Sequence, residues 1–170
     1  MILISKIIFY IKIYIVNKIL KGTHFFEIKK NLLKSKNIIL GKNVKIVGPI
    51  DINYNSELTI GDNTWIGKNF TIDGNGKTII GKNCDIAPNV TIVNGSHIIG
   101  SSERRAGEGI NFKSFIGDGT WIGSHVLILN GATIEKSCVV AARSTIIKDV
   151  KENTLVGGSP AQIIRKLDLK

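Results

Sequence analysis

One histidine of this chain lies in a stretch whose composition differs from that of its surroundings. His97 belongs to VNGSHIIGSSERRAGEGINFKSF, Val93 to Phe115, which also contains two adjacent arginines and several glycines. An imidazole gains and loses a proton near neutral pH, so it can take the proton of a hydroxyl group, an effect of typically about 10²–10⁴-fold on rate. His97 is therefore a candidate general base, and a polar residue of a surface turn is the alternative interpretation.

Few other residues could do chemistry. The chain has three histidines and two cysteines. His24 lies in a lysine-rich N-terminal segment, and surface exposure alone accounts for His125. Cys84 and Cys138 are too few for a disulfide framework, and they lack the spacing of metal ligands. We expect no metal site and treat His97 as the catalytic candidate.

The stretch around His97 interrupts a repeat. Aliphatic residues recur every six positions, with short slips, at Leu40, Ile46, Ile52, Leu58, Ile60, Ile66, Ile72, Ile80, Ile86, Ile92, Ile98, Ile116, Ile122, Ile128, Ile134, Val140 and Ile146. This period fits neither an amphipathic helix nor an alternating strand, but it fits a short strand followed by a turn. Three such units form a triangular coil with a stacked aliphatic interior, and several coils are needed to bury a core. The sequence therefore predicts an all-β solenoid.

A small or β-branched residue usually stands four positions after the aliphatic one. Cys84 and Cys138 occupy this position, so we expect them to be small inward-facing side chains. Ser96 and Ile98 continue the two series, and we extend the predicted interior to them. Gly and Asn are frequent at the expected turns, where the backbone often needs a positive φ.

Residues 99–114 do not continue the repeat. The positions in register with the aliphatic series are Arg104 and Ile110, and an arginine cannot point into a dry aliphatic core without a partner. A solenoid coil can expel an insertion without losing its stacking, and function concentrates in such loops. We therefore predict a protruding loop over residues 99–114, next to His97.

Hexads that begin with Leu, Ile or Val, continue with Gly and carry a small residue at the fifth position cover roughly residues 40–166. They resemble the repeats of the hexapeptide-repeat acyltransferases. The order of His97, Arg104 and Gly107, followed by IGDGTWIGSHV, is similar to galactoside- and maltose-type and surface-polysaccharide O-acetyltransferases. The C-terminal VVAARSTIIKDVKENTLVGGSPAQIIRKL resembles the end of the same enzymes. The resemblance implies a left-handed parallel β-helix, whereas general rules for parallel crossovers would favour the right hand.

The resemblance implies an acetyl-CoA-dependent O-acetyltransferase in which His97 takes the proton of a sugar hydroxyl as it attacks the thioester. No activated Ser or Cys nucleophile is evident, which favours direct transfer over a covalent acetyl-enzyme. By the same resemblance, the acetyl-CoA contacts are Trp121, Ser124, Ala142, Lys148 and Arg165, and the acceptor contacts are Asp73, Asn75 and Arg104. Gln162 departs from the family, which often has a second basic residue there. The resemblance also implies a homotrimer with active sites between subunits.

The basic charge of the chain is concentrated at one end. The formal net charge is +10, and ten of the 23 basic residues but only one of the 13 acidic residues lie in residues 1–45. No DNA- or RNA-binding motif accompanies these lysines, and the rest of the chain is nearly neutral. We therefore expect no nucleic-acid partner.

Residues 1–39 form an apolar and basic N-terminal arm, which we expect to be helical, before the β-helix (40–155) and a short C-terminal tail (156–170). Lysines interrupt the apolar runs of the arm, which are too short for a membrane span of about 20 residues. The arm also lacks the cleavage site of a secretory signal. It either packs on the protein or a partner subunit, or it contacts a membrane peripherally. We expect a cytoplasmic location, at the inner face of the membrane in the second case.

Several functions share this scaffold. We favour a sugar acceptor of cell-surface polysaccharide synthesis, such as O-antigen, capsule or exopolysaccharide. The enzymatic alternatives are acetylation of an antibiotic and N-acetylation of an amino sugar, although enzymes of the latter kind often carry a nucleotide-binding domain that 1–39 cannot accommodate. γ-Type carbonic anhydrases need three histidine ligands, and His97 and His125, which are 28 positions apart, do not match their spacing. A structural or ice-binding β-helix would show flat threonine arrays and no loop.

Overall fold

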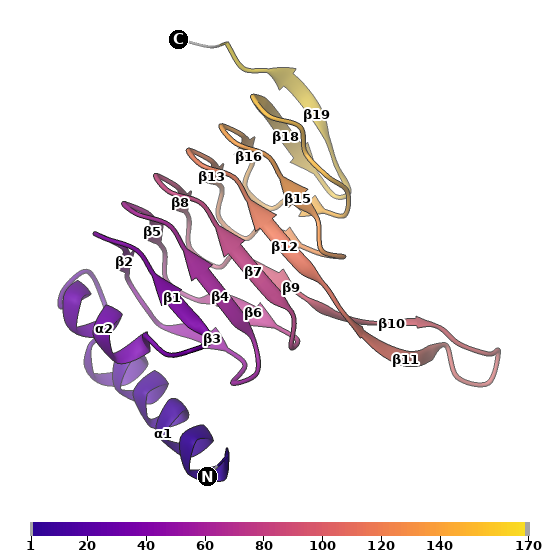
Figure 1. Ribbon diagram of the computed structural model, residues 1–170. Coiled ribbons are helices and arrows are strands. Elements are labelled where there is room, and N and C mark those ends of the chain that lie inside the picture. Colours follow the sequence, from indigo (N-terminus) through magenta and orange to yellow (C-terminus); the bar gives the residue numbers. More distant parts are fainter. Residues whose placement is uncertain (1, 169–170) are drawn as a thin grey trace.

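The computed structural model describes residues 2–168 (Figure 1). The chain begins with helix α1 (Ile2–Tyr14), a π-helical turn (Ile15–Ile19) and helix α2 (Phe26–Leu33). The described chain beyond α2 consists of strands and turns that wind into a solenoid. The helical N-terminal segment and the all-β body agree with the predicted architecture.

Successive strands of the solenoid belong in turn to three different sheets, and these sheets are the faces of a triangular prism. Face A contains β1 (Ile38–Leu40), β4 (Glu57–Ile60), β7 (Lys77–Ile80), β12 (Lys113–Ile116) and β15 (Thr133–Ile134). Face B contains β2 (Lys45–Ile46), β5 (Trp65–Ile66), β8 (Asp85–Ile86), β13 (Trp121–Ile122), β16 (Val139–Val140), β18 (Thr154–Gly158) and β19 (Ala161–Lys166). Face C contains β3 (Ile50–Ile52), β6 (Phe70–Asp73), β9 (Thr91–Val93), β14 (Leu127–Ile128) and β17 (Thr145–Ile146). Neighbouring coils pair in parallel, and β19 turns back antiparallel to β18 at the C-terminal end. The fold is the predicted all-β solenoid and agrees with a left-handed parallel β-helix.

Aliphatic side chains from successive coils stack inside the prism. On face B the aligned residues are Ile46, Ile66, Ile86, Ile122 and Val140, each at most 3% exposed. Burying one such side chain contributes about 1.5–3 kcal/mol relative to leaving it in water. The aliphatic columns therefore hold the coils together, as the six-residue period predicts.

The positions predicted to hold small residues are buried as well. Cys84 is 1% and Cys138 0% exposed, and burial raises the pKa of both thiols. Asparagines adopt positive φ at the turns Asn43, Asn63, Asn69, Asn83, Asn89, Asn130 and Asn153. Asn tolerates this conformation better than most residues, which explains its frequency at the corners.

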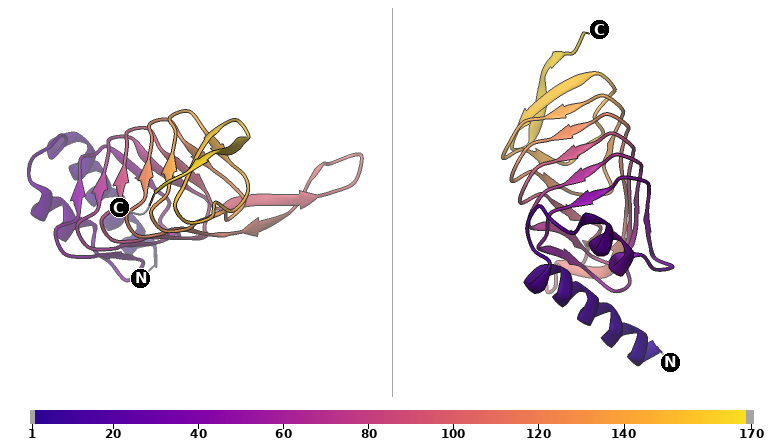
Figure 2. Two further views of the ribbon diagram at one scale, coloured as in Figure 1. Left: turned by 90° about the horizontal axis from the view of Figure 1, so that it is seen from above. Right: turned by 90° about the vertical axis from the view of Figure 1, so that its left-hand side faces the viewer.

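The chain leaves the prism after β9. Strands β10 (Gly95–Ile99) and β11 (Ala106–Asn111) form an antiparallel hairpin that extends away from the prism (Figure 2, left). The prediction that Ser96 and Ile98 continue the interior is wrong, because both lie in this hairpin; Ser96 is exposed, and so is Ile98, by 49%. The protrusion that the sequence placed at 99–114 as a loop is therefore a pair of strands that starts at Gly95, and β12 already belongs to face A.

Asn94 anchors the hairpin at the point where the repeat stops. Its side chain is fully buried; Nδ2 donates to Oγ1 of Thr78 (2.7 Å), and Oδ1 accepts from Oγ of Ser114 (2.6 Å). Its backbone carbonyl accepts from the N–H of Phe112 (2.8 Å), at the other end of the hairpin. A buried amide whose hydrogen bonds are satisfied fixes one local arrangement. Asn94 therefore ties both ends of the hairpin to the neighbouring coil.

The N-terminal arm covers the open end of the prism (Figure 2, right). Ile13, Val16 and Leu33 are buried and belong to the same core cluster as the first coils. Asn17 joins the arm to face C, since its Nδ2 donates to the carbonyl of Ile50 (2.7 Å) and its Oδ1 accepts from the N–H of Ile50 (2.8 Å). Within residues 2–168 no helix is long and apolar enough to cross a membrane.

A buried lysine joins the arm to face B. Lys29 is 0% exposed, and its Nζ donates to the carbonyl oxygens of Gly22 (2.6 Å) and Val47 (3.0 Å). Its ammonium group also lies 5.0 Å from the ring centroid of Phe26. Burial lowers the pKa of Lys29, because desolvation disfavours the charged form.

Candidate active site

The backbone of the hairpin orients the ring of His97. His97 lies in β10, and its Nδ1 is 2.8 Å from the carbonyl oxygen of Gly107 in β11. A carbonyl oxygen only accepts hydrogen bonds, so Nδ1 carries the proton, and the neutral ring leaves Nε2 as an acceptor. The side chain is exposed, so Nε2 can receive a proton from a bound molecule. This is the tautomer that a general base requires.

His97 lines a hollow of about 360 Å³ where face C turns into face A. Asp73, the last residue of β6, and Asn75 line the same hollow, so the structure brings together the predicted base and two predicted acceptor contacts. A carboxylate accepts hydrogen bonds and an amide both donates and accepts them, which suits a molecule rich in hydroxyl groups. Asn111, which the sequence analysis missed, also lines the hollow. It pairs with Gly95 across the hairpin, so recognising the antiparallel strands would have revealed it.

Two glycines let the coils approach closely beneath this hollow. Gly74 has φ +87°, and a Cβ at this residue would lie 2.4 Å from the backbone nitrogen of Gly95. A side chain there would force the two turns apart. The backbone of these turns therefore forms part of the lining of the hollow.

Arg104 lies away from this hollow. It belongs to the exposed turn between β10 and β11, at the far end of the hairpin. The backbone N–H of Gly100 donates to the carbonyl oxygen of Arg105 (2.9 Å) and closes this turn. Within one chain the structure does not bring Arg104 to the residues that surround His97.

Three of the predicted cofactor contacts lie on successive coils in the C-terminal half of the prism. Trp121 begins β13 on face B and is 56% exposed. Ser124 and Ala142 occupy turns at the edge between faces B and C, where the N–H of Arg143 donates to the carbonyl oxygen of Ser124 (2.9 Å). A Cβ at Gly123 would lie 2.6 Å from the nitrogen of Ala142, so the two turns touch. They present a strip of backbone along which an extended ligand with amide groups can lie.

The two predicted cationic contacts lie near the C-terminal end. Lys148 follows β17 and lines a second hollow, of about 210 Å³, together with Gln162. Arg165 is exposed on β19, opposite Leu155 of β18. Lysine and arginine side chains bind phosphate groups through charge-assisted hydrogen bonds. Both residues lie outside the hollow that His97 lines.

The predicted site is therefore divided between two edges of the prism. His97 and Asp73 lie at the edge between faces C and A, whereas Ser124 and Ala142 lie at the edge between faces B and C. Face C separates the two groups, and a prism is convex, so one copy cannot enclose a ligand between them. In residues 2–168 no group of three His, Cys, Asp or Glu side chains is placed so that it could hold a metal ion.

Comparisons with known proteins agree with this fold. Residues 113–148 match the family model for bacterial transferase hexapeptide (six repeats). The galactoside O-acetyltransferase of Escherichia coli K12 is 35% identical over 142 residues, which are 84% of this chain and 70% of that protein. WcaF of the same organism, named for an acetyltransferase of colanic acid biosynthesis, is 33% identical over 128 residues, 75% of this chain and 68% of WcaF.

A solved structure extends the similarity to three dimensions. The hexapeptide-repeat-containing acetyltransferase VCA0836 from Vibrio cholerae O1 biovar eltor, complexed with acetyl coenzyme A, superposes with a TM-score of 0.77. The match has 28% sequence identity and covers 96% of this chain and 87% of that one. Together with the repeats and the sequence relatives, this similarity shows that the chain belongs to the hexapeptide-repeat acyltransferase family and is an acyltransferase.

Proposed function

We propose that this protein transfers the acetyl group of acetyl-CoA to a hydroxyl group of a sugar, with His97 as the general base. The observation that carries the proposal is the hydrogen bond from Nδ1 of His97 to the carbonyl of Gly107 (2.8 Å). It leaves Nε2 as an acceptor in the hollow that Asp73 and Asn75 also line. The name of the E. coli galactoside O-acetyltransferase, at 35% identity, supports a sugar acceptor.

The proposed reaction is a direct transfer. The acceptor O–H gives its proton to Nε2 of His97 while its oxygen attacks the thioester carbon. The tetrahedral intermediate collapses, the C–S bond breaks, and the imidazolium returns the proton to the departing thiolate. Backbone N–H groups near the thioester carbonyl would stabilise the oxyanion. Cys84 and Cys138 are buried and burial raises the pKa of their thiols, so neither is suited to form a covalent acetyl-enzyme.

Acetyl-CoA is the donor that the family and the VCA0836 complex support. In this proposal the backbone at Ser124 and Ala142 holds the pantetheine arm, and Trp121 lies beside the reacting centre. Lys148 and Arg165 meet the phosphates of the nucleotide. Their exposure supports this role, since both cations face solvent at the C-terminal end of the prism.

We also propose a homotrimer with active sites between subunits. Ser124 and Ala142 lie on a different edge of the prism from His97, although Lys148 lies on the same edge as His97, and only a second copy could bring Ser124 and Ala142 to His97 across a cleft. Face A presents an outward column in register, formed by Ile39, Thr59, Ile79, Phe115 and Thr133. Ile39 is 59% and Phe115 36% exposed, which makes this column a candidate contact between copies. In a trimer the hairpin tip could carry Arg104 to the acceptor of a neighbouring subunit.

The acceptor that we favour belongs to cell-surface polysaccharide synthesis, which the name of WcaF supports. We further propose that the protein is cytoplasmic and touches the inner face of the membrane through α1. An outward stripe of this helix, formed by Leu3, Ile7, Tyr10, Ile11 and Tyr14, is exposed and has Lys6 beside it. Such a mixture of apolar and lysine side chains is typical of helices that lie on anionic membranes.

An acceptor screen tests the proposed reaction. Acetyl-CoA is mixed with free sugars, nucleotide sugars, amino sugars or antibiotics, and the released thiol of CoA is measured. Turnover with a hydroxyl sugar supports the proposal; turnover only with an amino sugar or an antibiotic contradicts it. His97→Ala should lower turnover by about 10²–10⁴-fold and leave acetyl-CoA binding unchanged. His125→Ala is the control, since His125 is exposed on a turn outside the hollow. Normal turnover of His97→Ala would exclude His97 as the base.

A further inference from the structure

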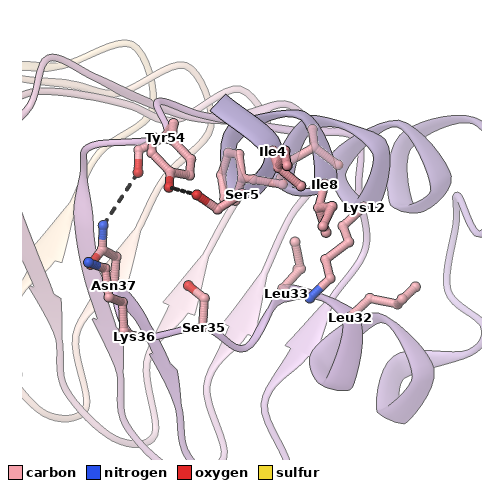
Figure 3. Close-up of a pocket in the computed structure, with 12 residues that line it drawn as sticks. Ile4, Ser5, Ile8, Lys12, Leu32, Leu33, Ser35, Lys36, Asn37 and Tyr54 are labelled. Atoms are coloured by element: carbon pink, nitrogen blue, oxygen red, sulfur yellow. Dashed lines mark hydrogen bonds between the residues drawn. The ribbon is translucent and has the colours of Figure 1, made fainter. Parts of the chain in front are cut away.

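The two helices and the first coil enclose a groove of about 580 Å³ (Figure 3). Its walls are apolar and consist of Ile4, Ile8, Phe9 and Ile13 from α1 and Leu32 and Leu33 from α2. Ile4 is 63% and Ile8 48% exposed, so these side chains face a space that the protein itself leaves uncovered. An uncovered apolar groove of this size marks a binding site in many proteins.

One end of the groove is polar. There the hydroxyl of Tyr54 is 2.8 Å from Oγ of Ser5, and Nδ2 of Asn37 donates to the carbonyl oxygen of Tyr54 (3.4 Å). Ser35 and the exposed Lys36 line the same end. Polar groups thus gather at the first coil, whereas the side chains between the helices are apolar apart from Lys12.

The groove is also cationic. Lys12 crosses it from α1 near Leu33, and Lys36 stands at the polar end (Figure 3). Neither ammonium group forms an ion pair with the part of the chain that the structure describes. Residues 1–45 contain ten lysines and one acidic residue, so the surroundings attract an anion. An apolar wall with cations at its rim is complementary to a lipid with an anionic head.

The polar end lies on the same edge of the prism as the hollow of His97. Tyr54 follows β3, Asp73 ends β6, and Gly95 follows β9. These three strands pair in register on face C. Neighbouring coils are about 4.8 Å apart, so the polar end and the root of the hairpin are about 10 Å apart along this edge.

We infer that the groove binds the lipid part of the acceptor, and that the acceptor is a saccharide joined through phosphate to a long acyl or isoprenoid chain. The chain would lie between α1 and α2, the phosphate would meet Lys36, and the saccharide would extend along the edge to His97. Each methylene group buried in the groove adds to the affinity. A sugar without a lipid chain lacks this contribution. This inference rests on the proposed transfer to a sugar and adds what the sugar is attached to.

Binding of decyl phosphate to the full-length protein, measured by calorimetry below its micelle concentration, tests the groove. Ile8→Glu should weaken binding by about tenfold or more, since it places a carboxylate on the apolar wall. The matched control is Ile7→Glu, because Ile7 is 51% exposed on the same helix but outside the groove. Lys36→Glu should weaken binding by about fivefold, with the exposed Lys34→Glu as its control. Equal losses in a variant and its control would overturn the inference.

Three further arms separate the explanations. Decanol and inorganic phosphate should each bind more weakly than decyl phosphate, and equal binding of either would overturn the combined tail-and-head site. Phosphatidylglycerol vesicles test a bilayer source: if Ile8→Glu loses vesicle binding as strongly as decyl phosphate binding, the groove serves membrane lipid and the acceptor assignment is overturned. If decyl phosphate does not bind and Ile8→Glu changes the molar mass in solution, a second copy covers the groove. None of these measurements requires acetyl transfer, so the proposed function can fail in the acceptor screen while the groove stands, and the reverse.

Discussion

The wall of the prism and the segments attached to it are built differently. In the wall, each coil repeats the last one, and aligned aliphatic residues such as Ile86 and Ile122 are completely buried. In the hairpin, the apolar side chains face outward, and Ile99 is 86% exposed. The buried amide of Asn94 and backbone hydrogen bonds at the root join the hairpin to the wall. The arm is joined to the wall by Asn17, by the buried ammonium group of Lys29 and by buried apolar side chains.

The wall therefore provides the stability of the fold, whereas the hairpin positions His97. The wall gains its free energy from apolar burial, which is non-directional and summed over many coils. The hairpin contributes little burial of its own but holds His97 at a defined place through directional hydrogen bonds. A general base needs a fixed position, because a small displacement of the imidazole moves it away from the proton that it must take.

The largest expected effect is in the wall. Ile122→Ala should lower the free energy of unfolding by about 2–5 kcal/mol, since it leaves a cavity in a fully packed column. Ile99→Ala in the hairpin should change it by less than about 0.5 kcal/mol. Chemical denaturation of both variants at one protein concentration measures the difference. A large loss for Ile99→Ala would mean that another copy of the chain covers the hairpin, and the contrast between the two regions would then hold only for a single chain.

The next effect is at the joint between wall and hairpin. Asn94→Ala removes the three side-chain hydrogen bonds of Asn94, to the carbonyl oxygen of Lys77 and to the hydroxyl groups of Thr78 and Ser114. We expect a loss of about 1–3 kcal/mol in the free energy of unfolding. Turnover should fall more than in the control Ser101→Ala, since Ser101 is exposed in the turn at the far end of the hairpin and lies outside the hollow of His97. If Asn94→Ala unfolds earlier but keeps full activity, the position of His97 does not depend on this joint.

The repeats were sufficient to predict the wall of the prism but not the residue at which the chain leaves it. A period of six gives the inward positions of Ile86, Ile122 and both cysteines, because each hexad makes the same contact as the one before it. Extending that period gave the wrong place for Ser96 and Ile98, since a repeat contains no information about where it ends. Asn94 gave no signal in the sequence, because Asn130 stands at the same position of a hexad after which the repeat continues.

The sequence predicted only the part of the candidate site that lies on one edge of the prism. His97, Asp73 and Asn75 meet in one hollow, as expected for a base and its acceptor contacts. Arg104, Trp121, Ser124 and Ala142 lie elsewhere in the single chain. Under the proposed trimer a second copy would bring them to the hollow, and a sequence describes one copy. The sequence analysis also did not predict the groove between α1 and α2. Leu32 and Leu33 of α2 lie beside α1 because of a turn that no sequence motif predicts.

The smallest expected effect concerns the joint between wall and arm. Burial lowers the pKa of Lys29 below 10.5, so between the lowered value and 10.5 the unfolded chain binds more protons than the folded one. The free energy of unfolding therefore gains a contribution that rises with pH across this interval. Lys29→Met should remove that rise, whereas the exposed Lys34→Met should keep it. Denaturation curves at several alkaline pH values measure the two slopes. Identical slopes in wild type and Lys29→Met would show that water reaches the ammonium group, and that the joint between arm and wall owes its pH dependence to other groups than Lys29.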